Sequence, residues 1–125
     1  MSKLNDKDLK NMKPPEGKGL IYLIRSRSTG TLIKFKVFVN DEYIGATKGK
    51  NFLYKIVDPG HYKILSKAEN QHEMEFEVEA GKIYYVLQKI RLGVIKARVR
   101  MYLTDEGEGR TRLKKCKLSK VLPKE

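Results

Sequence analysis

The chain has 125 residues, of which 40% are hydrophobic and 34% charged, and its net charge at pH 7 is +12. This length corresponds to one ordinary domain and excludes a two-domain nucleotide enzyme. The composition allows a modest core under a heavily charged surface, and 7 Tyr and 4 Phe at regular positions argue against an open disordered chain. The charge favours contact with an acidic partner but does not indicate a fold.

Targeting signals and cysteines leave the compartment open. The longest apolar stretches, such as 19–24 and 83–87, are far shorter than the roughly 20 residues of a membrane-spanning helix, so we predict no transmembrane segment. Residues 1–12 lack the apolar stretch of a secretory leader. We expect a periplasmic or envelope location if a leader was removed, and a cytoplasmic one otherwise. The single cysteine, Cys116, has no partner for an internal disulfide.

The apolar pattern defines one β-rich domain between two polar ends. We expect a flexible lead-in over residues 1–17, a domain over 18–118 and a flexible tail over 119–125. Short Val, Ile, Phe and Tyr runs divided by turn residues predict an all-β fold, a single antiparallel β-sandwich of seven or eight strands with a short C-terminal helix. The predicted strands are 20–25, 33–39, 42–47, 51–57, 61–69, 72–79, 82–91 and 96–103.

One hairpin is predicted at the level of register. A two-residue turn at 40–41 sets the pairing of its strands. The expected pairs are Val39 with Glu42, Phe38 with Tyr43, and Val37 with Ile44. Phe38 and Tyr43 then lie among lysines on the outer face. Either the N-terminal arm or the C-terminal helix covers these two aromatic residues, or they form a docking patch for a partner.

A short helix is predicted over residues 108–116, with Asp105 as its cap. Leu113 and Cys116 are expected to face inward. Basic neighbours favour a lowered thiol pKa at Cys116, whereas an inward position favours simple packing. We expect packing, because the residue follows Leu113 at a helical spacing.

Candidates for catalysis are few. His61 follows a Pro-Gly turn and His72 opens a strand, and these turn or edge positions explain both residues without catalysis. The glutamates at 73, 75, 77 and 79 alternate along one strand, which spreads their carboxylates along a ridge instead of around one metal ion. We therefore predict no catalytic residue, no metal ligand, no cofactor and no enzymatic activity. An enzyme would need one histidine beside a carboxylate in a cleft.

The basic residues are the strongest functional signal. Residues 110–125 contain seven Lys and Arg against one Glu, and alternation over 96–102 predicts a second basic face that includes Tyr102. Such surfaces suit anionic lipid headgroups, a cell-wall polyanion or nucleic acid, or serve only solubility. The candidate patch for an anionic partner consists of Lys96, Arg98, Arg100, Arg110, Arg112, Lys114, Lys115 and Lys117.

Several short motifs follow one another in a characteristic order. They are Pro14-Pro15-Glu16-Gly17-Lys18, Ile21-Tyr22-Leu23-Ile24-Arg25, Phe35-Lys36-Val37-Phe38-Val39-Asn40, Tyr43-Ile44-Gly45, Pro59-Gly60-His61-Tyr62, Val78-Glu79-Ala80-Gly81-Lys82, Tyr84-Tyr85 and Leu113-Lys114-Lys115-Cys116. This order resembles a bacterial family known only as a domain of unknown function, whose members are mostly small predicted envelope lipoproteins or exported proteins. The resemblance runs from residue 13 to about residue 118.

The middle of the chain is also similar to the PEGA type of surface β-domain. The shared features are a strand, an Asn turn, an Ile-Gly strand, a Pro-Gly-aromatic turn and an Ala-Gly-Lys hairpin. Asp41 stands where such hairpins usually have Gly, and the lipidation cysteine and leader of exported relatives are missing. Both resemblances imply a small sandwich of the transthyretin or prealbumin kind, and neither implies a reaction.

The sequence therefore predicts a non-enzymatic binding or structural module, placed at the bacterial cell envelope by the resemblance. Its basic surface would contact anionic lipid or a cell-wall polyanion, and a protein partner remains open. The alternative is a cytoplasmic nucleic-acid-binding β-domain. The residues assigned to that alternative are Lys96, Arg98, Arg100, Arg112, Lys114 and Lys115.

Overall fold

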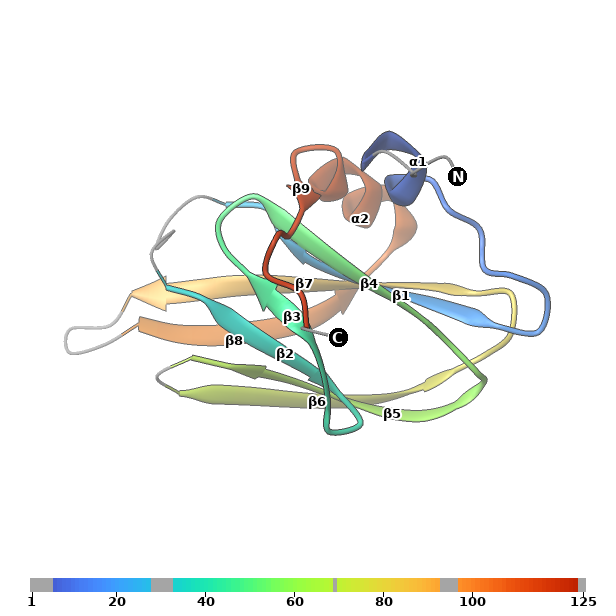
Figure 1. Ribbon diagram of the computed structural model, residues 1–125, viewed down its shortest axis with the longest axis horizontal. Helices are drawn as coiled ribbons and strands as arrows, with labels where there is room; N and C mark the ends of the chain where they lie inside the picture. The colour runs from blue at the N-terminus through green and yellow to red at the C-terminus, as the bar shows by residue number, and fades with distance from the viewer. Residues whose placement is uncertain (1–5, 28–32, 69, 93–96, 124–125) are drawn as a thin grey trace.

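The computed structural model describes the backbone of residues 6–27, 33–68, 70–92 and 97–123, and their side chains except those of 91, 92, 97 and 98. Within this part, nine strands form two sheets and two short helices accompany them (Figure 1). The elements are α1 (Asp6–Lys10), β1 (Gly19–Arg25), β2 (Phe35–Val39), β3 (Glu42–Thr47), β4 (Asn51–Val57), β5 (Gly60–Lys67), β6 (Gln71–Val78), β7 (Ile83–Leu92), β8 (Ala97–Thr104), α2 (Glu106–Leu113) and β9 (Lys117–Leu118).

The five-stranded sheet has the order β8-β7-β1-β4-β9, and the four-stranded sheet has the order β3-β2-β5-β6. The predicted β-rich fold with a short C-terminal helix is confirmed. The predicted count of seven or eight strands is wrong for the described residues, because the two-residue β9 adds a ninth strand. β9 pairs with β4, and its two residues, at the end of the predicted domain, show no alternating apolar pattern from which a strand could be predicted.

β1 is the central strand of the five-stranded sheet, and both of its faces are buried. Its sequence is apolar without alternation, as is typical of a strand covered on both sides. It pairs antiparallel with β4 and parallel with β7, and β4 pairs parallel with β9. The prediction of a purely antiparallel fold is therefore wrong at two pairings. Residue alternation indicates the buried face of a strand but not the direction of its neighbour.

Two apolar cores lie on opposite faces of the five-stranded sheet. One fills the space between the sheets and includes Leu23 and Val37. The other lies between the five-stranded sheet and the helices and includes Leu9, Tyr22 and Leu113. The two sheets thus pack face to face, and the helices form a partial third layer on one side. A single two-layer sandwich does not describe this arrangement.

α2 begins after its predicted cap, Asp105, whose side chain accepts a hydrogen bond from the main-chain N–H of Glu108 at 2.8 Å. The helix starts two residues before the predicted 108–116 and ends at Leu113, so Cys116 is buried beyond its end. Gly109 has a packing role in this helix. A Cβ there would lie 2.3 Å from Cγ of Tyr85, so glycine lets α2 lie directly on that ring.

The β2–β3 hairpin confirms most of the predicted register. Asn40 and Asp41 both have positive φ, 47° and 69°, as a tight two-residue hairpin turn requires. The first two predicted pairs are present, but Val37 lies opposite Gly45 and not opposite Ile44. A β-bulge shifts the register there, and Gly45 supplies a φ of 138° that other residues rarely adopt.

Both ends expected to be flexible contain packed residues. In the predicted lead-in, α1 places Leu9 in the core beneath the helices. In the predicted tail, Ser119 is buried, and the Val121 carbonyl accepts a hydrogen bond from the N–H of Ala46 at 2.9 Å. The packed part of the chain therefore extends beyond both predicted boundaries.

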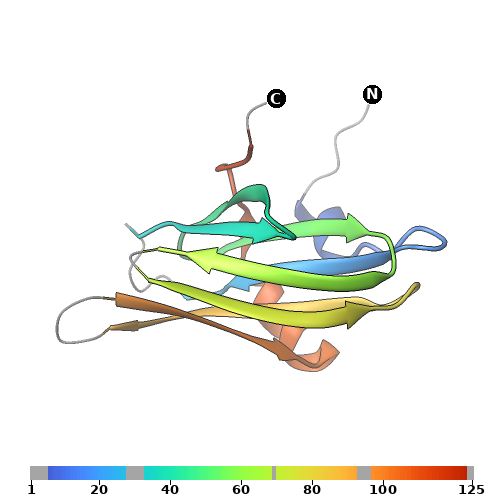
Figure 2. The same ribbon diagram turned by 90° about the horizontal axis from the view of Figure 1, so that it is seen from below.

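Asn70 and His72 connect the two sheets at one edge, where β6 runs next to β8 (Figure 2). Their side chains accept hydrogen bonds from the main-chain N–H groups of Val99 and Met101, at 3.1 and 3.0 Å. Unpaired N–H groups of an edge strand are a template for pairing with another chain. These side chains therefore protect part of the β8 edge.

Candidate anion-binding site

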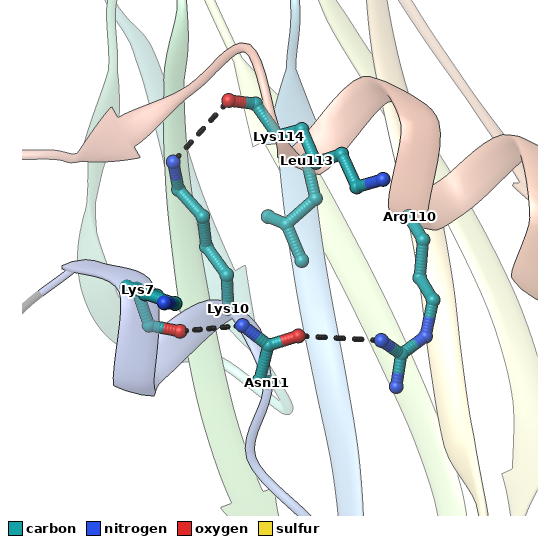
Figure 3. A pocket seen from close by; sticks show the side chains of 6 residues that line it. All are labelled: Lys7, Lys10, Asn11, Arg110, Leu113 and Lys114. Atoms are coloured by element: carbon teal, nitrogen blue, oxygen red, sulfur yellow. Dashed lines mark hydrogen bonds between the residues drawn. The ribbon is translucent and has the colours of Figure 1, made fainter.

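A pocket of about 270 Å³ lies between α1 and α2 (Figure 3). Four cationic side chains, one amide and one leucine line it: Lys7, Lys10, Asn11, Arg110, Leu113 and Lys114. No acidic side chain of the described residues is among them. The pocket is therefore a place of concentrated positive charge with an apolar floor at Leu113, which is buried.

Arg110 is held in place by three neighbours. Its Nε donates a hydrogen bond to Glu106 at 3.2 Å, and its Nη1 donates one to the side-chain oxygen of Asn11 at 3.3 Å. Its third neighbour is the side chain of Tyr85. Burial raises the pKa of Tyr85, so this phenol stays neutral at pH 7 and does not cancel the charge of Arg110. The guanidinium is thus oriented before a ligand arrives.

α1 has only five residues and depends on tertiary contacts for its place. The hydroxyl of Tyr22 donates a hydrogen bond to the Leu9 carbonyl, and burial raises the pKa of Tyr22 to about 12, so this donor persists at neutral pH. Lys10 Nζ donates to the carbonyl of Lys114 at 3.4 Å. Asn11 donates to the Lys7 carbonyl at 2.7 Å. These bonds fix both walls of the pocket.

Neighbouring acids leave most of the positive charge of the pocket uncompensated. Within the described part of the chain, Arg110 forms an ion pair with Glu106, whereas Lys7, Lys10 and Lys114 form none. Like charges around one cavity repel each other, and a bound anion removes that repulsion. The chemistry available here is electrostatic binding, since no Ser, Cys or His of the described residues lines the cavity.

The structure divides the predicted anionic-partner patch. Arg110 and Lys114 line the pocket, whereas Arg112 lies 3.6 Å from Glu108 in an ion pair on the same helix. Lys115 is exposed beyond the helix, and Lys117 is exposed in β9. Sequence reasoning missed Lys7 and Lys10, because they stand in a segment without an apolar pattern.

The second predicted basic face lies on the β7–β8 hairpin. Lys96 lies outside the described residues, and so does the side chain of Arg98. Arg100 is exposed and pairs in register with Lys89, which the sequence analysis did not select. The Lys89 ammonium lies 5.1 Å from the ring centroid of Tyr102. Two cations opposite each other weaken a hairpin, and the cation–π contact offsets part of this cost.

The candidate docking patch lies on the outer face of the four-stranded sheet. Phe38 and Tyr43 are half-buried, and their ring centroids lie 5.5 Å apart. Neither helix covers them, because both helices pack on the five-stranded sheet. Tyr43 also borders a groove that is lined by Leu122 and Pro123 of the C-terminal segment.

The two histidines lie away from the described cavities. His61 is exposed between Glu77 and Glu75, with nitrogen-to-oxygen distances of 2.7 and 3.2 Å. Hydrogen bonds, first with Glu75 and then with Glu77, raise the pKa of His61 above its usual 6.5. His72 accepts the hydrogen bond from Met101 described above.

Cys116 is buried beside the helix-side core, and burial raises the pKa of its thiol to about 11. Among the described residues, no three His, Cys, Asp or Glu side chains are close enough to hold a metal ion. In the same part of the chain, neither helix is long and apolar enough to cross a membrane.

The fold and the pocket define a β-rich protein with two sheets and a basic cavity under two short helices. The chain belongs to the family described as "Protein of unknown function (DUF2846)", whose model matches residues 15–100. This confirms the predicted membership in a family of unknown function. The match contains most of the strands, whereas both helices that form the pocket lie outside it.

The chain is also similar to a curated protein that is longer than the chain itself. The chain is 25% identical over 107 residues to an uncharacterized protein of Haemophilus influenzae. That alignment covers 85% of this chain and 64% of the Haemophilus protein, so the chain spans less than two thirds of its relative's length. No solved structure matches the chain.

Proposed function

We propose that this protein is a non-enzymatic binding module of the bacterial cell envelope, and that the side covered by the helices takes an anionic partner. The observation that carries the proposal is the pocket between α1 and α2. Four cations face one cavity there, and no acidic side chain of the described residues lines it. Such a charge arrangement raises the local concentration of anions.

The residues that could perform chemistry support a binding role. Both histidines are engaged outside the described cavities, one with two glutamates and one with a main-chain N–H. The Cys116 thiol is buried and has a raised pKa, which disfavours the reactive thiolate. These features favour binding over catalysis.

The envelope location rests on the resemblance to small exported β-domains, including the PEGA type, and a relative from a bacterium is consistent with it. An envelope location makes anionic lipid headgroups and cell-wall polyanions the expected partners. Each Lys or Arg near an anionic membrane surface contributes about 1 kcal/mol, so four such residues give substantial attraction.

Co-sedimentation of the purified protein with lipid vesicles tests this proposal. We expect retention by vesicles that contain phosphatidylglycerol and none by neutral phosphatidylcholine vesicles. Retention should fall when the salt concentration rises, because salt screens exposed charges. Equal retention by both kinds of vesicle, or by neither, would contradict an anionic envelope partner.

A specific observation favours nucleic acid as the second candidate. On the β7–β8 hairpin, Lys89 lies over the Tyr102 ring and is the cross-strand partner of Arg100, so cations that attract phosphates accompany an aromatic surface for stacking. A parallel titration with single-stranded DNA separates the candidates. DNA binding much tighter than vesicle binding, with a steep salt dependence, would favour nucleic acid.

A further inference from the structure

The proposed function specifies an anion but not its chemistry. Resting on that function, we propose that the pocket between α1 and α2 binds a phosphate ester. Arg110, Lys7 and Lys114 surround the phosphate group, and the esterified organic group lies against the methylene groups of the lining lysines. The ester is either a lipid headgroup or a soluble molecule, since both present phosphate oxygens to the pocket.

The number and kind of donors favour phosphate. A guanidinium offers a fork of N–H groups that matches two oxygens of a phosphate, and each lysine adds a mobile point charge. The two oxygens of a carboxylate lie in one plane and face one side. The oxygens of a phosphate ester are arranged tetrahedrally around phosphorus, so cations from different sides of the pocket can contact them at once.

The size and floor of the pocket favour an ester over a bare ion. A volume of about 270 Å³ is close to the lower limit of small-molecule pockets and exceeds what one phosphate ion fills. Leu113 lines the pocket but is only 1% exposed, so the apolar surface that a ligand can reach consists of the methylene groups of the lining lysines. A small organic group can cover this surface, whereas a fully hydrated ion gains little from it.

The surroundings prepare the pocket for an anion. Asn11 and Glu106 orient Arg110 from two sides, so little freedom is lost when a ligand binds. The pocket lies at the C-terminal end of α2, whose carbonyls carry partial negative charge. Lys10 donates to one of these carbonyls, that of Lys114, and thereby reduces the repulsion of an incoming phosphate.

Titration of the whole chain with sn-glycerol 3-phosphate, followed by the amide NMR signals of Asn11 and Leu113, tests the inference. Glycerol is the uncharged probe, and phosphatidylglycerol vesicles present the ester as a lipid. We expect saturable shifts with the phosphate ester and none with glycerol. Arg110→Ala should weaken binding about tenfold or more, because it removes a charged hydrogen-bond donor.

Two further variants separate a loss of binding from a loss of folding. Lys7→Ala changes an exposed side chain, so the fold should be retained while binding weakens several-fold. Lys115→Ala is the matched control, because it removes the same charge next to Lys114 from a residue that does not line the pocket. Its affinity should stay within about twofold of the parent, since an exposed charge outside the pocket contributes little after screening.

The outcomes distinguish the source of the ester and the two proposals. The pocket is supported if Lys7→Ala loses binding and Lys115→Ala retains it. Binding of the free ester then indicates a soluble ligand, and binding of phosphatidylglycerol vesicles alone indicates a lipid. Equal losses in both variants overturn the pocket but leave an anion-binding surface and the proposed function standing. If wild-type protein binds neither free ester nor anionic vesicles, both proposals fail.

Discussion

Nη1 of Arg110 lies 3.3 Å from the side-chain oxygen of Asn11, although 99 residues separate the two in the chain. Asn11 follows α1, near the start of the described chain, and Arg110 lies in α2, after the last long strand. The contact therefore joins two segments from opposite ends of the sequence, on one face of the five-stranded sheet. The basic pocket exists because both ends pack on the same face of that sheet.

Gly109→Ala should destabilise the protein by about 1–3 kcal/mol, because the new methyl group would overlap the Tyr85 ring. That ring is stacked on Tyr22 at 5.7 Å and has little room to move. Chemical denaturation measures the change. Gly107→Ala is the matched control in the same helix. The nearest atom to its new Cβ is 3.4 Å away, so this variant should be neutral or about 0.5–1 kcal/mol more stable.

A Gly109→Ala protein as stable as the Gly107→Ala protein would contradict the close packing of α2 on the sheet. This outcome is informative for the pocket as well. Arg110 follows Gly109 directly, so a displaced α2 would also move the guanidinium away from Asn11.

Gln88→Ala should lower the free energy of unfolding by at least about 2 kcal/mol. Gln88 links two buried hydroxyls in the core between the sheets: it accepts from Thr47 at 2.8 Å and donates to Ser66 at 2.6 Å. Its removal leaves both hydroxyls without this partner and creates a cavity. Thermal or urea denaturation measures the loss. Gln71→Ala, on the exposed face of β6, is the control and should change stability by less than about 0.5 kcal/mol.

The pKa of His61, followed by the ring proton signals in NMR, should lie above 6.5 because Glu75 and Glu77 favour the protonated ring. Glu75→Gln should lower it. Glu73→Gln removes the same charge from the same strand, but Glu73 pairs with Leu65, so this control should have a smaller effect. Equal pKa shifts in both variants would indicate that His61 responds to the total negative charge of the acidic strand and not to the specific contact with Glu75.

The direction of the pH dependence follows from the raised pKa of His61. The folded state binds this proton more tightly than the unfolded chain does, so its contribution to stability is fully present below about 6.5. It is lost as the pH rises through the folded pKa. Glu75→Gln should therefore reduce stability at pH 5 more than at pH 8, as denaturation at both values would show.

Cys116 should react slowly with iodoacetamide at pH 7 in the folded protein and rapidly after unfolding. Burial raises the thiol pKa to about 11, which depletes the thiolate, and the side chain is 1% exposed. Mass spectrometry of the alkylated protein with and without denaturant measures both rates. Fast alkylation under native conditions would contradict the packed position and favour the interpretation as a reactive cysteine.

Features that depend on neighbouring residues could be predicted from the sequence. Strong β content follows from the alternating apolar runs, the turn at Asn40 and Asp41 follows from residues that tolerate positive φ, and the cap at Asp105 follows from its short acidic side chain. Each of these outcomes depends on a few consecutive residues. The buried positions of Leu113 and Cys116 were also correctly inferred from their spacing.

The bulge at Gly45 could not be predicted from neighbouring residues. Alternation predicts Val37 opposite Ile44, but the C-terminal segment pairs with β3. The Val121 carbonyl oxygen lies only 2.7 Å from the point that a Cβ at Gly45 would occupy. The bulge and the glycine allow this approach. A contact between residues so far apart leaves no periodic signal in either segment.

The sequence by itself determined that this chain forms a β-rich domain with a strong positive charge. Only the tertiary structure decided that β1 pairs parallel with β7, that the polar segment around Leu9 packs as a helix, and that its lysines meet Arg110. The physical reason is that local preferences are encoded in neighbouring residues. Pairing direction and pocket formation depend on contacts between distant segments. Such a contact forms only where its favourable free energy exceeds the conformational entropy that is lost when the segments are brought together.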